Sequence, residues 1–227
     1  MVNNIYDISL NSEKKKMKIK PPNFSGSLKH NTPFLAALIV NIVVFLFTAF
    51  NPQLMMWLAI GTESSLGIFT AYTFNFTHAG LFHIVMNILV LFVFQEQIRL
   101  RLYYKKWAQW FLYFGTPLVI GLILFVIGTP PTVGYSGVVM ALLTFGIVFK
   151  FDGYKSIAIQ LVLFHIIAFL VTDVWLGINI SFIGHAVGAV VGASFAWYMR
   201  NYKKYHTWKY KKTKSKETNW RDRHNKM

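Results

Sequence analysis

Long apolar stretches separated by short polar connections are the dominant pattern of this sequence. Six stretches approach the roughly 17 to 25 residues that a helix needs to cross a hydrocarbon core of ~30 Å. They lie at about 34–50, 78–97, 107–127, 136–149, 156–176 and 181–199. An open sheet in lipid would leave backbone N–H and C=O groups unpaired, so each stretch is predicted to be a helix. The pattern therefore predicts an all-α polytopic membrane protein with a six-transmembrane-helix bundle.

Composition and charge agree with a membrane protein and predict its orientation. The mean hydropathy is +0.43, too high for a soluble domain of 227 residues. Of the 23 Lys and Arg residues, six lie in 1–33, four in 98–106, two at Lys150 and Lys155, and eleven from Arg200 onward. The three remaining connections carry none. Because positive residues collect on the cytoplasmic side, both termini are predicted to be cytoplasmic.

The same charges divide the chain into three parts. Residues 1–33 are predicted to be a basic cytoplasmic segment, 34–200 the membrane domain, and 201–227 a basic cytoplasmic tail. The tail is expected to rest on anionic lipid, and nucleic acid is not expected as a partner. The chain has no cysteine, which excludes disulfide and thiol chemistry. No cleavable signal peptide is recognisable, so the first apolar stretch is expected to act as a signal anchor.

Four polar side chains within the apolar stretches are expected at one depth in the membrane. Counted from the nearest basic residue at ~1.5 Å per residue, Ser136, His185, Asn87 and His83 lie roughly 18 to 24 Å from the cytoplasmic side. Polar groups at such a depth are costly and mark functional sites. The stretch that begins at Ser136 is too short to span, so the loop 128–135 before it is expected to fold into the protein.

These four residues supply the groups that acyl transfer needs. Ser136 is the candidate nucleophile, and His185 is the candidate base that accepts its proton. His83 and Asn87, at i and i+4 of one helix, are candidate oxyanion donors together with the Ser136 backbone N–H. No carboxylate is expected at this depth, so the site is predicted to be a Ser and His dyad that uses no metal and no cofactor.

Glycines and two further histidines complete the candidate site. Gly134 and Gly137 flank Ser136 and allow a tight turn, while Gly188 and Gly192 follow His185 and would let its helix pack closely on the helix of Ser136. His78, five residues before His83 in the same predicted helix, lies about 140° around that helix and is not on the same face. His78 is therefore expected to order the first external loop. His165 has no evident partner and is expected to contact a neighbouring helix only.

Three separated motifs resemble those of the rhomboid family of intramembrane serine proteases. They are Gly134-Tyr135-Ser136-Gly137, the HAGLFHIVMN segment with His78, His83 and Asn87, and the spacing of His185, Gly188 and Gly192. The resemblance covers about residues 35–200. It implies a serine-type endopeptidase that cleaves membrane proteins in or near their transmembrane segments, with Ser136 and His185 as the dyad and His83, Asn87 and Ser136 as the oxyanion hole.

The expected setting is a bacterial plasma membrane, with the active site opening toward the extracytoplasmic side. The expected partners are transmembrane protein substrates and the lipid bilayer. Two alternatives remain open at this point. The chain could be a non-catalytic rhomboid-like protein that binds transmembrane helices without cutting them. It could also be a small transporter lined by His78, His83, His165 and His185. The sequence predicts neither a physiological substrate nor an oligomeric state.

Overall fold

The computed structural model describes residues 31–61, 66–103, 105–150, 155–169 and 182–202. The described residues are helical apart from their connections and one isolated backbone bridge, so the all-α prediction is confirmed for this part of the chain. The two basic terminal segments lie almost entirely outside the described residues, and their predicted cytoplasmic location stays a prediction.

Helices occupy each of the six predicted regions. The longer elements are α2 (Thr32–Ala49), α5 (Leu81–Arg101), α6 (Lys106–Trp110) continuing through a π-helical turn (Phe111–Gly115) into α7 (Thr116–Ile127), α8 (Ser136–Phe149), α9 (Lys155–Phe169) and a last helix, Phe182–Tyr202. Short helical turns make up the first loop: α3 (Pro52–Leu58), η1 (Gly67–Phe69), α4 (Thr70–Thr73) and η2 (Phe74–Phe76).

Four of these helical segments are long and apolar enough to cross a membrane. They are Thr32–Ala49, Leu81–Arg101, Lys106–Ile127 and Phe182–Tyr202. Helix α8 has 14 residues and is too short, as the sequence predicts, and the described part of α9 has 15. The predicted bounds 78–97 are wrong at both ends, because α5 begins at Leu81 and ends at Arg101.

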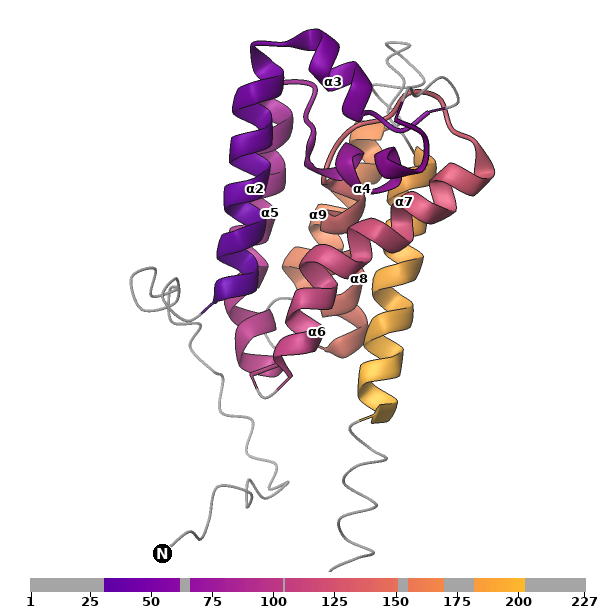
Figure 1. Ribbon diagram of the computed structural model, residues 1–227. Helices are drawn as coiled ribbons and strands as arrows, with labels where there is room; N and C mark the ends of the chain where they lie inside the picture. The colour runs from indigo at the N-terminus through magenta and orange to yellow at the C-terminus, as the bar shows by residue number, and fades with distance from the viewer. Residues whose placement is uncertain (1–30, 62–65, 104, 151–154, 170–181, 203–227) are drawn as a thin grey trace, which may run out of the picture.

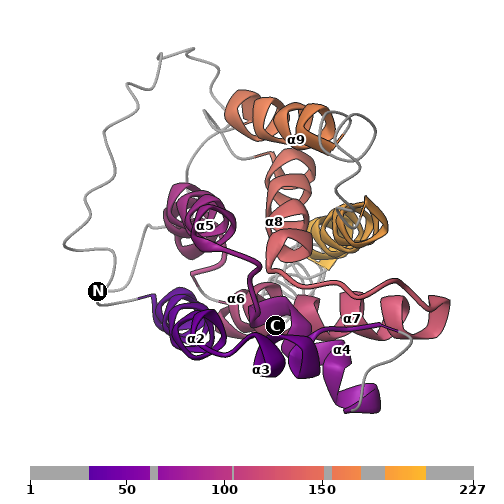
Figure 2. The same ribbon diagram turned by 90° about the horizontal axis from the view of Figure 1, so that it is seen from above.

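Helix α8 lies at the centre of the bundle. Seen from above, it stands between α5 on one side and the Phe182–Tyr202 helix on the other, with α9 and α7 next to it (Figure 2). Most of its residues are buried, including the run from Gly137 to Leu143. Such a helix has few ways to shift, because packed cores resist displacement. The first residue of α8 is therefore held at a defined position.

The first loop lies at the end of the bundle where α8 begins, with α4 packed against α7 (Figure 1). A Cβ added at Gly121 of α7 would overlap the carbonyl oxygen of Ala71 in α4, so the two backbones are in contact. Ile60 exchanges backbone hydrogen bonds of 3.1 and 2.8 Å with Thr132. The first loop is thus attached both to the third span and to the loop before Ser136.

The loop 128–135 folds into the protein in part: Gly128, Pro130 and Pro131 are exposed, whereas Thr129 and the last two residues before Ser136 are buried. Thr129 and Tyr135 are 2% and 0% exposed. The backbone N–H of Gly134 donates a 2.9 Å hydrogen bond to the carbonyl of Phe74. Irregular backbone at this level is tolerated because protein groups pair it. The loop thus enters α8 along a fixed path.

Candidate active site

Ser136 and His185 lie within hydrogen-bonding distance. The Oγ of Ser136, the first residue of α8, is 2.8 Å from Nε2 of His185 on the Phe182–Tyr202 helix. The two residues are 49 positions apart in the chain. With the neutral ring protonated at Nδ1, Nε2 accepts the serine proton, which is the arrangement that a nucleophile and its base require. The structure therefore brings together the two residues that the sequence analysis pairs.

Contact between the backbones of two helices sets this distance. A Cβ added at Gly188 would overlap the carbonyl oxygen of Gly137, and one added at Gly192 would overlap that of Ala141. A Cβ at Gly137 would lie 3.1 Å from the carbonyl oxygen of Gly184. The predicted close packing of these helices through small residues is present.

A hydrogen bond crosses the same interface deeper in the bundle. Thr144 Oγ1 lies 2.9 Å from the carbonyl oxygen of Ala189 and also within reach of the carbonyl oxygens of Met140 and Ala141 in its own helix. The bond to Ala189 links α8 to the last helix two turns below the candidate dyad. Sequence analysis did not assign Thr144 a role.

His83 lies against the turn that leads to Ser136. A Cβ at Gly134 would stand 2.5 Å from Cε1 of His83 and 3.6 Å from Oγ of Ser136. Gly134 also has φ +127, a conformation that residues with a side chain rarely adopt. Both observations require glycine at this position. They also place the His83 ring on the same turn as the candidate nucleophile.

Asn87 follows one helical turn after His83 on the same face of α5. Its side chain is 3% exposed, and its Nδ2 has no hydrogen-bond partner. A buried amide without a partner costs roughly 1 to 3 kcal/mol, so such groups are rare in folded proteins. An unused donor at this position is available to a ligand or a reaction intermediate.

His78 does not lie on α5, so the helical-wheel argument that separated it from His83 is wrong. Residues 77–80 precede the helix, and the ring of His78 meets the ring of His83 edge-on at 5.1 Å. Nδ1 of His78 donates to the carbonyl of Phe76 at 3.2 Å, which agrees with the expected role in ordering the first loop. Burial, with a smaller effect of the neighbouring His83, lowers the pKa of His78 to about 3, so this ring is uncharged at neutral pH.

Tyr135 is a further residue at the site that the sequence analysis did not single out. Its hydroxyl donates to the backbone carbonyl of Tyr113 in the third span, and its ring packs against Phe76 with centroids 5.6 Å apart. The side chain is completely buried. It immediately precedes Ser136 in the chain, so its attachment bears directly on the position of that residue.

Acidic groups and metal sites are scarce in the described part of the chain. Glu96 is the only carboxylate side chain there, and it forms an ion pair of 2.6 Å with Arg99 on α5. Glu63, Asp152 and Asp173 fall outside the described residues. No group of three or more His, Asp or Glu residues that could hold a metal ion occurs among the residues described. The side chain of His165 also lies outside the described part.

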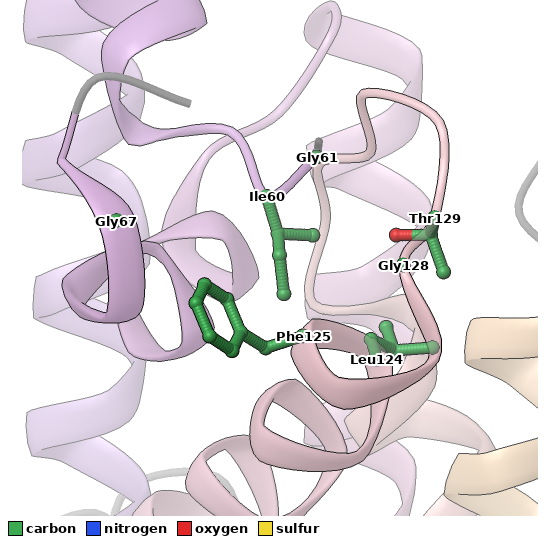
Figure 3. Close-up of a pocket in the computed structure, with 7 residues that line it drawn as sticks. All are labelled: Ile60, Gly61, Gly67, Leu124, Phe125, Gly128 and Thr129. Atoms are coloured by element: carbon green, nitrogen blue, oxygen red, sulfur yellow. The ribbon is translucent and has the colours of Figure 1, made fainter. Parts of the chain in front are cut away.

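A hollow of about 300 Å³ lies apart from the candidate dyad, between the first loop and the end of α7 (Figure 3). Its lining residues are Ile60, Gly61, Gly67, Leu124, Phe125, Gly128 and Thr129. None of them is a candidate catalytic residue. The hydroxyl of Thr129 has no hydrogen-bond partner.

Comparison with known proteins supports the resemblance seen in the motifs. The family model described as "Rhomboid domain" matches residues 65–202, which is more than half of the chain and includes all the candidate site residues. No curated protein matches the chain. The matched region, the apolar helices and the paired Ser136 and His185 agree in one conclusion: the chain belongs to the rhomboid family.

Proposed function

We propose that this protein is an intramembrane serine endopeptidase that uses Ser136 and His185 as a catalytic dyad. The observation that carries the proposal is the 2.8 Å separation of Ser136 Oγ and His185 Nε2. A serine hydroxyl is a weak nucleophile unless a base takes its proton. A helix N-cap would explain the serine alone, but it would not explain a histidine on another helix at hydrogen-bonding distance. Tyr135, and not Ser136, occupies the N-cap position of α8.

The reaction proceeds in two steps. Oγ of Ser136 attacks the peptide carbonyl carbon while Nε2 of His185 takes the hydroxyl proton, and the tetrahedral intermediate carries a negative oxygen. His185 then gives the proton to the leaving amine as the C–N bond breaks, which leaves an acyl-enzyme. Water, deprotonated by His185, releases the new carboxylic acid and restores Ser136.

The oxyanion is stabilised by donors that are in place before the reaction. The unpaired Nδ2 of Asn87 is one such donor, and the His83 ring beside Gly134 is another. The backbone N–H of Ser136, at the start of α8, has no partner within its own helix. Donors that need no reorganisation are effective in catalysis, and removal of one costs about 10² to 10³ in rate.

The proposed setting is a bilayer crossed by six helices, with both termini in the cytoplasm and the active site open to the extracytoplasmic side. The distribution of Lys and Arg supports this orientation. The proposed substrates are membrane proteins cut in or near a transmembrane segment. The proposed location is a bacterial plasma membrane.

Cleavage of a single-span membrane substrate in liposomes tests this function. Wild type should cut it, and Ser136→Ala and His185→Ala should each abolish cleavage. Ser194→Ala is the matched control, because Ser194 is an exposed serine on the helix of His185. A chelator should not change the wild-type rate. Equal cleavage by all variants would refute the dyad.

The same experiment separates the two alternatives. A non-catalytic protein that binds transmembrane helices would capture the substrate and never cut it, with or without Ser136. A histidine-lined transporter would need metal, and its activity would be lost with the chelator and retained in Ser136→Ala. The free donor of Asn87 favours the protease, because a protein that only binds helices has no use for an unpaired amide at this place.

A further inference from the structure

We infer that Tyr135 is a positioning residue for the nucleophile. Its hydroxyl donates to the backbone carbonyl of Tyr113 and so ties the turn that carries Ser136 to the third span, at a π-helical turn that is followed by a proline. The inference rests on the proposed function, since it assigns the tie a role in the chemistry of Ser136. It concerns a side chain that does not itself contact the reacting atoms.

The acceptor of this hydrogen bond is unusual. In an α-helix the carbonyl of Tyr113 would accept the N–H of residue 117, four positions later. Residue 117 is proline and has no N–H. The helix is already altered here, because the preceding turn is π-helical and the N–H of Thr116 donates to Phe111. Proline at 117 thus removes one helical donor from this π-helical stretch, and the hydroxyl of Tyr135 donates a hydrogen bond to the carbonyl of Tyr113 within it.

The donor is placed where a small rotation would move the nucleophile. Tyr135 directly precedes Ser136, and its side chain is fully buried against Phe76. The neighbouring Gly134 is fixed through its N–H to Phe74. The two bonds attach the turn to two different parts of the protein, the third span and the first loop. If the Tyr135 bond is removed, only the Gly134 bond to Phe74 remains of these two hydrogen bonds.

A second buried tyrosine provides a natural comparison. The side chain of Tyr113 is also fully buried, but its hydroxyl makes no hydrogen bond. Replacing either tyrosine with phenylalanine removes one buried hydroxyl and leaves the ring. Tyr135→Phe also removes a hydrogen bond to the Tyr113 carbonyl, whereas Tyr113→Phe removes no hydrogen bond. Comparing the two variants therefore separates the effect of losing the Tyr135–Tyr113 hydrogen bond from the effect of losing a buried hydroxyl.

The first measurement is the steady-state cleavage of a single-span substrate by both variants, at a temperature where each is folded. Tyr135→Phe should lower kcat about tenfold and leave KM within twofold, because misplacement of a reacting group slows the chemical step. Tyr113→Phe should stay within twofold of wild type in both constants. Wild-type kcat in Tyr135→Phe would overturn the inference.

A double variant distinguishes positioning from general stability. Pro117→Ala restores an N–H that can pair the Tyr113 carbonyl when Tyr135→Phe has removed the hydroxyl. In the double variant, thermal stability should recover toward the wild-type value while kcat stays low. Recovery of kcat together with stability would mean that the bond serves only to satisfy the carbonyl. That result would also overturn the inference.

A third measurement does not depend on proteolysis. The chain has no cysteine, so Ser136→Cys introduces one thiol, and its alkylation by iodoacetamide can be followed against pH. A thiol beside His185 should form its thiolate at lowered pH. Adding Tyr135→Phe should move this profile to higher pH, and adding Tyr113→Phe should not. If wild type cuts no substrate but the profile moves, the proposed function fails and the positioning role stands; an unmoved profile overturns the role itself.

Discussion

Helix α8 and the turn that leads into it are held in two different ways. From Gly137 to Ala141 the helix meets the Phe182–Tyr202 helix through backbone contact, with no room for a side chain at Gly188 or Gly192. The turn before the helix is held by individual hydrogen bonds, from Gly134 to Phe74 and from Tyr135 to Tyr113. The first contact fixes where the two helices lie, and the second fixes how one turn is oriented. Changes in the body should therefore damage the fold, whereas changes in the turn should damage the chemistry first.

Gly188→Val should have the largest effect. The new side chain would overlap the carbonyl of Gly137 and force the two helices apart, which separates Ser136 from His185. Overpacking of this kind costs about 1 to 3 kcal/mol or more, and we expect both cleavage and thermal stability to be lost. Gly80→Ala is the control, since a Cβ at Gly80 meets nothing within 4 Å; it should leave cleavage unchanged and lower stability by no more than about 1 kcal/mol, because alanine is a poorer N-cap than glycine. A stable, active Gly188→Val protein would show that the helices are not in contact.

Gly134→Ala should have the second-largest effect, and it should lower activity more than stability. The φ of +127 disfavours alanine, and the added Cβ would press on the ring of His83. We expect a loss of about 10² in kcat, comparable to removal of one oxyanion donor. The loss of unfolding free energy should be about 1 to 3 kcal/mol, the usual cost of such a backbone conformation. If Gly134→Ala is unstable but its folded molecules keep wild-type activity, the turn does not act on the chemistry first, and the contrast with the helix contact is wrong.

The sequence predicts the body of the bundle better than the turn. Apolar length and the cost of polar groups in lipid are properties of single segments, so the spans and the depth of Ser136 and His185 can be estimated by counting. Small residues at Gly188 and Gly192 likewise indicate close packing without reference to a partner. Among the residues it describes, the structure confirms helices in these stretches and the close packing at Gly188 and Gly192, while the depth of Ser136 and His185 in a membrane stays a prediction.

The features that were missed depend on contacts between distant segments. His78 was assigned to the helix of His83 because counting cannot show where that helix starts, and α5 starts only after Gly80. The role of Tyr135 depends on a carbonyl 22 residues earlier in the chain. Pro117 is a visible signal that a carbonyl lacks its donor, but the sequence does not show which side chain supplies one.

Thr144→Val sharpens the comparison with a smaller change in the body of α8. It removes the hydroxyl that bonds to the carbonyl of Ala189 across the interface and keeps nearly the same shape. We expect a loss of about 1 kcal/mol in unfolding free energy, the usual value of such a bond. Activity should fall less than twofold, because the backbone contact at Gly188 still sets the helix distance. A large loss of activity would mean that this bond, and not the glycine contact, aligns the dyad.

Thr129→Val makes the same replacement in the loop before Ser136 and should have the opposite sign. The hydroxyl of Thr129 is buried with no partner, beside the hollow between the first loop and α7 (Figure 3). Removal of an unpaired buried hydroxyl relieves a cost, so we expect a gain of about 1 kcal/mol in unfolding free energy and an unchanged cleavage rate. Thermal unfolding of Thr129→Val and Thr144→Val side by side measures this difference. Destabilisation by Thr129→Val would show that the hydroxyl does have a partner, and the loop would then be held by more than the bonds at Ile60, Gly134 and Tyr135.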